Sequence, residues 1–419
     1  MLSALADAFK IEELRNKILF VLAMIVVYRL GAHIPVPGID PQALEEIFAG
    51  GGVLGFLDLF AGGALSQFSI FALSISPYIT ASIIMNLLTV VIPKLEELSN
   101  QGQEGRKIIN KYTRYATVLL GLIQGVGITM LIRNYNAIKN PSLFNLFTIV
   151  IVLTAGAVFI MWLGEQITEY GIGNGISILI TISILSRFPG GVVQTMESLR
   201  AGAIGVISLV AFVVIAVLVI AAIVLIEEGQ RKVPVQYSKR VVGRKVYGGQ
   251  STHIPMKVNQ AGVMPIIFAS SLLLFPATLA QFINHPAAQR VAEMLSPGQP
   301  LYIVLYALLI IFFTYFYTAI QFNPAEIADN MKKHGGFVPG RRPGRPTAEY
   351  LDRILTRLTL AGAIFLALIA IIPEGLIGIT GVEIQFGGTA ILIVVGVGLR
   401  TMKQIETQLM SRHYEGFMQ

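Results

Sequence analysis

The stretch GFLDLFAGGALSQFSIFALSISPYITASIIMNLLTVVIP, residues 55–93, decides the fold of this chain. It is long enough to cross a bilayer, but its first half is interrupted by Asp58, Gly62, Gly63, Gln67 and Ser69. Irregular backbone at membrane depth persists only where it is buried in protein or lines a water-filled cavity, because lipid offers no hydrogen bonds. The protein is therefore predicted to enclose a cavity that this first half enters.

The second half of the stretch, residues 74–92, has the composition of a membrane helix. Its Ile75 and Ile79 are four residues apart, so their side chains are expected on one helix face. Isoleucine pairs of this kind usually pack in a core or face lipid. The spacing alone therefore leaves a structural role and a functional role both open.

The composition is that of a membrane protein with many spans. Of the 419 residues, 54% are hydrophobic and 13% charged, and the mean hydropathy is +0.70, which excludes a soluble protein. The absence of cysteine excludes disulfides, thiol nucleophiles and thiolate metal sites. The first apolar run has no small-residue cleavage site before it continues, so it is predicted to be a retained span.

Ten apolar windows have roughly the length that crosses about 30 Å of hydrocarbon. They fall at residues 18–34, 74–92, 115–132, 144–163, 175–187, 204–226, 261–283, 301–320, 354–372 and 382–399. The shortest window, 175–187, follows the sequence GIGNG, in which Asn174 is predicted to cap a helix. An eleventh span over residues 56–73 is disfavoured by its glycines and by Asp58.

Positive charge predicts how the bundle is oriented. Of the 31 Lys and Arg residues, 25 fall in the N-terminus, in segments 93–114, 227–258 and 323–357, and in the tail from Arg400. Since Lys and Arg of short loops stay in the cytoplasm, both termini are predicted to be cytoplasmic. Arg29 lies within the first window. The other five basic residues are assigned to the opposite loops: Arg133, Lys139, Arg187, Arg200 and Arg290.

Ten windows divide into five and five near residue 200. An odd number of spans in each half makes the second half run inverted, which is typical of two repeats with a functional path between them. The predicted domains are an N-terminal half, 1–200, and a C-terminal half, 201–419. An ordinary ten-span bundle without repeats is the alternative.

Signatures of enzymes are missing from the sequence. It has no GxxxxGK[ST] loop, HExxH helix or GxSxG elbow, and no cofactor or metal site is predicted. The central turns of the windows lack Asp, Glu and His, which disfavours a proton-coupled carrier. A secondary transporter of the inverted-repeat kind and a membrane enzyme remain as alternatives. The first requires ligands for a substrate at mid-membrane, and the second requires a catalytic constellation in the spans.

The segments 227–258 and 323–357, called here the cytoplasmic arms, combine paired basic residues with Pro, Gly and aromatic residues. One interpretation is a pair of solvated or lipid-facing basic loops. The other is a pair of projecting, semi-rigid arms that dock a large anionic surface such as RNA or an acidic protein.

The chain resembles the bacterial SecY family of protein translocase subunits. The matching stretches follow one another over nearly the whole chain: IPVPGID at 34–40, FAGGALS at 60–66, FALSISPYITASII at 71–84, MWLGEQITEYGIGNGISI at 161–178, EEGQRKVPVQYSKR at 227–240, QSTHIPMKVNQAGVMPIIFASS at 250–271 and FNPAEIADNMKKHGGFVPGRRPG at 322–344. The resemblance implies an all-α polytopic fold of about ten transmembrane helices, in two inverted five-helix halves that form a clamshell around a central pore. It also implies a plug after the first span and a lateral exit to lipid.

The function that the resemblance implies is a protein-conducting channel in the bacterial plasma membrane. Such a channel passes unfolded secretory polypeptides across the membrane and releases hydrophobic segments sideways into lipid. It is not an enzyme, and its energy comes from a separate motor ATPase or from the ribosome. The implied partners are the small membrane subunits SecE and SecG, the motor ATPase SecA, the ribosome, signal peptides, nascent chains and phospholipid.

The resemblance also implies roles for individual residues. The pore ring falls on Ile75, Ile79, Ile176, Ile180, Ile267 and Ile393. The plug segment, 55–69, includes Gly55, Phe56, Leu57, Asp58, Leu59, Phe60, Ala61, Gly62 and Gly63. A simple re-entrant loop is the alternative for this segment.

Two further groups of residues match the family. The lateral gate, between the second and third spans on one side and the seventh and eighth on the other, includes Asn86, Gln124 and Asn259. Burial of these residues for packing alone is the alternative. Docking of the motor and the ribosome falls on Arg240, Arg244, Lys245, Arg341 and Arg342. Arg341 replaces the apolar residue that is commoner at its position, which adds charge beside Arg342.

Overall fold

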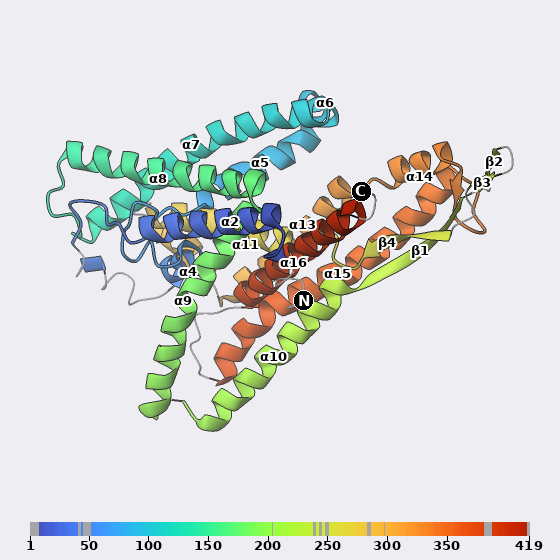
Figure 1. Cartoon of the computed structure of the whole chain (residues 1–419). Coiled ribbons are helices and arrows are strands. Elements are labelled where there is room, and N and C mark those ends of the chain that lie inside the picture. Colours follow the sequence, from blue (N-terminus) through green and yellow to red (C-terminus); the bar gives the residue numbers. More distant parts are fainter. Residues whose placement is uncertain are drawn as a thin grey trace.

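The computed structural model describes residues 8–40, 43–44, 52–202, 204–237, 240–242, 245–247, 251–282, 286–296, 298–380 and 388–416. The helices up to residue 200 are α2 (Glu12–Gly31), α4 (Gly52–Ala61), α5 (Ser76–Val91), α6 (Pro93–Asn100), α7 (Gln103–Asn134), α8 (Leu143–Tyr170) and α9 (Gly175–Arg200). The later helices are α10 (Val206–Glu228), α11 (Met264–Phe282), α12 (Pro286–Met294), α13 (Pro300–Gln321), α14 (Pro324–Lys333), α15 (Arg345–Thr380) and α16 (Gly388–Gly416). Figure 1 shows the helices up to α9 mainly on the left, the later helices on the right, and the strands on the right as well.

Each of the ten predicted windows overlaps a helix, although residue 283 and the first residues of window 382–399 lie outside the described ranges. Within those ranges, six helices are long and apolar enough to cross a membrane alone, and a seventh span is possible if α5 and α6, bent by 100°, count as one. The apolar part of α11, Met264–Pro276, is shorter. The mostly helical, polytopic fold is therefore confirmed.

Several helix ends differ from the ends of the predicted windows. The helix that follows Asn174 does not end at Arg187 but continues through Pro189 to Arg200, so Arg187 lies inside α9 rather than in a loop. The Asn174 side chain accepts a hydrogen bond from the Ser177 N–H at 3.0 Å, as the predicted cap requires. The helix expected from residue 74 begins at Ser76.

The cytoplasmic arms add two small sheets to the mostly helical fold, one of three strands and one of two. The strands are β1 (Gln230–Tyr237), β2 (Arg240–Val242), β3 (Lys245–Tyr247), β4 (Ser251–Lys257) and β5 (Gly336–Phe337). β1 pairs antiparallel with β4 on one side and with β5 of the other arm on its other side. The two arms thus project together at the right of Figure 1, beside α14.

Buried and exposed residues alternate along β1, which explains why this segment forms a strand. Val233 and Val235 are buried while their neighbours Lys232 and Pro234 are exposed, which is the period of two that a half-buried strand requires. The two valines pack in one apolar cluster with Leu351 of α15. The arms are therefore anchored on a helix rather than suspended as loops.

Helix contacts fall into two groups along the chain. In the first, α2 and α7 contact α8, α5 contacts α7, and α8 contacts α9. In the second, α13 contacts α11 and α15, and α16 contacts α10 and α15. Contacts between the groups join α11 to α4, α5 and α7, and join α9 to α16. The division into halves at residue 200 stays a prediction that this grouping favours.

Gly156 allows α8 to lie close to Ile70, the residue that directly follows the plug segment. A Cβ on Gly156 would lie 1.8 Å from the carbonyl oxygen of Ile70. Gly156→Ala is expected to lower the stability by about 1–3 kcal/mol, the usual effect of overpacking. Thermal unfolding of the purified protein in detergent measures this, with Gly398→Ala as the control, because a Cβ there meets nothing within 4 Å. Equal unfolding temperatures for the two variants would contradict the close approach.

Candidate functional site

The plug segment lies against the first turn of α5. Helix α4 ends at Ala61, and the chain then turns at Gly62 and Gly63, which have φ values of +64° and +88°. Such left-handed backbone is readily adopted only by glycine. The turns continue to α5, and Leu57, Phe60 and Leu65 of the plug segment line one cavity together with Ile75 and Ile79.

A small cavity separates the plug segment from α5, α7 and α11. Its volume is about 50 Å³, which leaves room for only a few water molecules. Its lining includes Leu57, Phe60, Leu65, Ile75, Ile79, Gln124, Ser270, Ser271 and Leu274. The plug segment and the two isoleucines therefore face one another across a narrow gap.

The six residues of the predicted ring share one environment. Ile75, Ile79, Ile180, Ile267 and Ile393 are each at most 6% exposed and belong to one apolar cluster. Ile176 is half-buried and packs against the same cluster. The backbone N–H of Ile79 donates to the Ile75 carbonyl at 3.0 Å, so these two residues do lie one helical turn apart. This cluster covers most of the core, so the ring itself stays a prediction.

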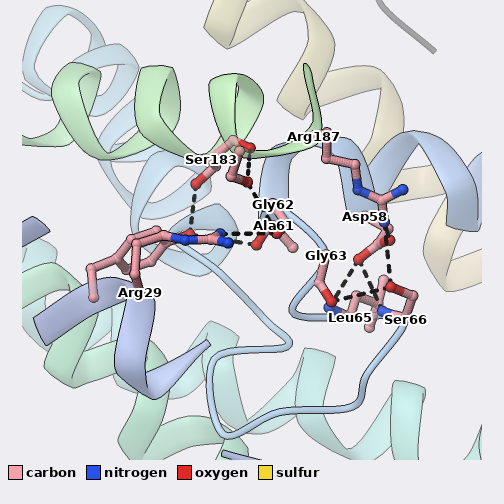
Figure 2. A network of polar contacts seen from close by, with 11 residues as sticks. Arg29, Asp58, Ala61, Gly62, Gly63, Leu65, Ser66, Ser183 and Arg187 are labelled. Atoms are coloured by element: carbon pink, nitrogen blue, oxygen red, sulfur yellow. Dashed lines mark hydrogen bonds and ion pairs between the residues drawn. The ribbon is translucent and has the colours of Figure 1, made fainter. Parts of the chain in front are cut away.

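Asp58 is the buried charge of the plug segment. It is 1% exposed, and its Oδ1 accepts hydrogen bonds from the backbone N–H groups of Leu65 at 3.0 Å and Ser66 at 2.9 Å. Its Oδ2 forms an ion pair with the guanidinium of Arg187 in α9 (Figure 2). One carboxylate thus fixes the turn after α4 and ties it to a neighbouring helix.

The carbonyls at the end of α4 are held by side chains from other elements. The last carbonyls of a helix lack partners within it, and here three of them accept from outside. The Ser74 hydroxyl donates to Phe60 O at 3.2 Å, and the Tyr28 hydroxyl lies 3.4 Å from Ala61 O. Gly62 O accepts from Arg29 at 3.3 Å and from Ser186 at 3.2 Å.

These contacts form a set that we call the plug clamp, contributed by α2 and α9 on the two sides of the 61–66 turn (Figure 2). Its members outside the plug segment and its continuation are Tyr28, Arg29, Ser183, Ser186 and Arg187. Ser183 joins the set through its hydroxyl, 2.6 Å from that of Tyr28. The plug segment is therefore fixed by polar contacts as well as by apolar packing.

The plug clamp was not predicted from the sequence, although the sequence contains one signal for it. A charged side chain within a membrane span is costly and usually has a partner and a function. Arg29 lay within a predicted span, and Arg187 lay at the end of another. Together with Asp58 they could have been treated as possible partners, but no spacing rule pairs residues so far apart in sequence.

At the predicted lateral gate, the structure brings two of the three polar residues to the boundary between the helix groups. The Asn86 amide of α5 donates to the Tyr317 hydroxyl of α13 at 3.4 Å. Gln124 of α7 lines the small cavity together with Ser270 and Ser271 of α11. Tyr317 was not identified from the sequence, because tyrosine in an apolar helix carries no distinctive pattern.

The third residue, Asn259, lies in a different polar cluster. Its amide donates to Glu227 at the end of α10 at 2.5 Å, and its oxygen accepts from the Gly262 N–H at 2.8 Å. Arg400 of α16 donates to Gln260 O at 3.4 Å nearby. In this cluster, burial lowers the pKa of Lys257, and Lys403 and Arg400 lower it further. These bonds of Asn259 stay within the second helix group and do not cross the predicted gate.

The predicted docking residues lie in the cytoplasmic arms. Arg341 and Arg342 are exposed in the turn before α15, and the Arg341 guanidinium lies over the Tyr350 ring, 5.0 Å from its centre. Arg240 begins β2 and Lys245 begins β3, at the far end of the arm. Arg244 lies outside the described residues.

An apolar groove runs along the outside of α9, α10 and α16. Its volume is about 460 Å³, and its lining includes Phe188, Val192, Phe212, Val217 and Val394. Helix α10 is the most apolar span, with a mean hydropathy of 3.6 and only 11% of that window buried inside the protein. Lipid or another apolar helix must therefore cover most of α10.

Metal chemistry finds no support among the described residues, where no group of three or more His, Asp or Glu side chains could hold an ion. The buried groups near the plug segment are instead apolar side chains, hydroxyls and one ion pair.

Comparisons with known proteins agree on one family. Residues 69–402 match the protein family SecY. The protein translocase subunit SecY of Streptomyces galbus is 50% identical over 439 aligned residues, with the whole of both chains covered. The subunit of the same name from Mycobacterium tuberculosis H37Rv is 47% identical, again over the whole of both chains.

Solved structures share the fold at lower sequence identity. A structure described as a protein-conducting channel matches with a TM-score of 0.67 and 18% identity, covering 94% of this chain and 92% of its own. A structure of the Sec61 channel in a canine ribosome complex matches with a TM-score of 0.63, 18% identity and the same coverage. The arrangement of helices described above is therefore that of these channels.

Proposed function

Because the chain belongs to the SecY family of protein translocase subunits, we propose that it conducts polypeptides through the ring of six isoleucines, with residues 55–69 as the closure. As a member of this family it is the protein-conducting channel of the translocase, embedded in a membrane and not an enzyme. The observation that carries the proposal is the fit of the plug segment beneath Ile75 and Ile79, with only about 50 Å³ left between them and α11.

The chemistry of the ring suits a passing polypeptide. Branched alkyl side chains expel water from a narrow passage, and such constrictions gate by dewetting. They also offer no hydrogen bonds that would hold a translocating chain. The buried state of Ile180, Ile267 and Ile393 supports a closed resting pore in which the plug segment and the ring act together.

Orientation follows from charge. Both termini and the basic arms are placed in the cytoplasm by the positive-inside rule, and the bacterial relatives favour the plasma membrane. Helix α2 then runs outward, and the plug clamp lies toward the outer side of the membrane.

The lateral gate is placed between α5 and α7 on one side and α11 and α13 on the other. The bond from Asn86 to Tyr317 crosses this boundary, and an interhelical bond of this kind contributes roughly 0.6–2 kcal/mol. An arriving signal helix gains about 0.8 kcal/mol per CH₂ moved from water to lipid, which is enough to separate such a latch. Asn259 has a place in the gate only if its bond to Glu227 is exchanged on opening.

Small membrane subunits of the kinds called SecE and SecG are proposed as permanent partners. The apolar groove along α9, α10 and α16 is lined by residues of both helix groups. A transmembrane helix bound there would hold the two groups together. The low burial of α10 supports a partner of this type.

The motor ATPase and the ribosome are proposed to dock on the cytoplasmic arms. The sheet that joins the two arms gives a single projection, with Arg341 and Arg342 in the turn after β5 and with Arg240 and Lys245 at the starts of β2 and β3. Arg244 is proposed for docking as well, although it lies outside the described residues. Contacts of these basic residues with ribosomal RNA would weaken steeply with added salt, because they would be contacts to phosphate.

Arg342→Glu is expected to abolish motor-driven export while leaving the protein folded. Arg342 is exposed in a turn, so its replacement removes a docking charge and little packing. The measurement is ATP-dependent export of a secretory protein into vesicles that contain the purified complex and the motor. The control is Arg345→Glu, an equally large change of charge at an exposed arginine three residues away.

If Arg342→Glu exports as much protein as wild type, the assignment of Arg342 to docking is wrong. The same vesicles address the transporter alternative, because saturable uptake of a small solute by the purified chain would favour it over a polypeptide channel.

A further inference from the structure

A second cavity lies beside the plug clamp, at the end of α2 away from the N-terminus. Its volume is about 400 Å³. Its walls come from α2, from the turn after α4 and from α9, and its lining consists of Arg29, Ala32, His33, Gly62, Gly63, Ser66, Gln67, Ser186, Arg187, Gly190, Gly191 and Gln194. Two arginines, a histidine, two serines and two glutamines therefore line it, and no carboxylate does.

The charge of this cavity is positive even with the plug clamp intact. Asp58 lies behind the wall, with Oδ1 occupied by two backbone N–H groups and Oδ2 by Arg187. Arg29 adds a second guanidinium and donates to Gly62 O. A guanidinium carries five N–H donors, so both arginines can keep these bonds and still donate into the cavity.

Glycines keep the cavity open. A Cβ on Gly190 of α9 would meet no atom within 4 Å, and one on Gly63 would first meet Arg187 at 3.9 Å. Both positions therefore border empty space. A side chain at residue 190 would enter that space without clashing with the fold.

The surroundings of the cavity are those of a lipid boundary. Leu30 and Ile34, on α2 and just beyond its end, are 64% and 50% exposed, and Val193 on α9, outside the groove described above, is 58% exposed. Apolar side chains this exposed on two spans face hydrocarbon. A donor-rich cavity beside such a surface lies at the depth where lipid phosphates meet protein.

We propose that this cavity binds a phosphate group, held by Arg29 and Arg187 with the amides of Gln67 and Gln194 as further donors, and that the headgroup of an anionic phospholipid supplies it. Paired guanidinium groups match the geometry and charge of phosphate oxygens. Free inorganic phosphate has the same chemistry, and the lipid boundary favours the headgroup as the source.

Binding at this site stabilises the closed plug. Four of the lining residues, 62, 63, 66 and 67, belong to the plug segment, so the site is complete only when that segment is in place. A ligand that binds only the closed state reduces the open population by a factor of one plus its concentration over its Kd. At ten times the Kd, the open population falls about tenfold.

The test measures binding to the purified complex in detergent by native mass spectrometry. The probes are short-chain phosphatidylglycerol, short-chain phosphatidylcholine and inorganic phosphate. Arg29→Gln is expected to weaken phosphatidylglycerol binding about tenfold, the effect of losing one charge-assisted contact. Gly190→Leu fills the cavity without changing its charge and should weaken binding as strongly. Arg133→Gln, which removes an exposed arginine at the end of α7, should change nothing.

Loss of phosphatidylglycerol binding in both cavity variants, with phosphatidylcholine little bound by any protein, supports the headgroup. If inorganic phosphate alone shows this pattern, the phosphate site is supported and the lipid source is overturned. If both cavity variants bind phosphatidylglycerol and phosphate as wild type does, the proposal is wrong. Gly190→Leu decides the outcome if Arg29→Gln fails to fold.

Discussion

Asp58→Asn is expected to make the closed channel leak ions, because it leaves the partly buried Arg187 without its carboxylate. The two side chains are 2% and 22% exposed, and removing one partner from a buried ion pair typically destabilises a structure by 3–5 kcal/mol. Movement of the plug segment alone is enough to expose the unpaired charge of Arg187 to water. If the closed position of the plug segment is destabilised by about 3 kcal/mol, the population of the open position rises about a hundredfold.

The measurement is single-channel conductance of the purified complex in planar bilayers. Glu104→Gln is the matched control, since it also removes a carboxylate from an ion pair, but an exposed one, 2.9 Å from Lys107. The charge exchange Asp58→Arg with Arg187→Asp should be tighter to ions than either single change. If Asp58→Asn conducts no more than wild type, the plug clamp does not hold the channel closed.

Replacing Ile75 and Ile79 together by serine is expected to produce a lasting ion leak. These two residues line the small cavity above the plug segment, and polar side chains hold water where branched alkyl groups expel it. Because both are at most 6% exposed, each change should also lower the stability by about 2–5 kcal/mol. Ile149→Ser, at an equally buried position in α8, controls for this loss and should not leak.

Removing the plug has a related effect on the same recordings. Deletion of residues 56–64 should make the closed channel flicker open, yet export should continue if a nearby part of the chain can take the plug's place. If neither the ring variants nor the plug deletion conducts more ions than wild type, the isoleucines are not the seal.

Much of the bundle could be predicted from hydropathy alone. The ten apolar windows all fall on helices, and the cap at Asn174 forms as the sequence indicates. Helix ends were less predictable, because an apolar window ends at the first charged residue whereas a helix can continue beyond it. Arg187 was placed in a loop for this reason, although its ion pair with Asp58 allows it to lie within α9.

The pairing of the strands in the arms and the contacts of the plug clamp could not be predicted from local patterns. β1 is a short strand whose partners, β4 and β5, come from both arms, so its pairing depends on the tertiary fold. The plug clamp joins residues 28 and 29, 58 to 66, and 183 to 187. Likewise the bond of Asn86 to Tyr317 spans 231 residues, and no spacing in the sequence indicates such a pair.

The central claim, that polypeptides pass the isoleucine ring, is tested most directly by crosslinking. Because the chain contains no cysteine, Ile79→Cys provides a unique thiol at the ring, and Val214→Cys, 53% exposed on α10, provides a matched one on the outer surface. A secretory chain with a single cysteine is stalled in the channel and oxidised. The account predicts a disulfide to residue 79 and none to residue 214. A stalled chain that never reaches residue 79, or that reaches residue 214 equally well, would contradict it.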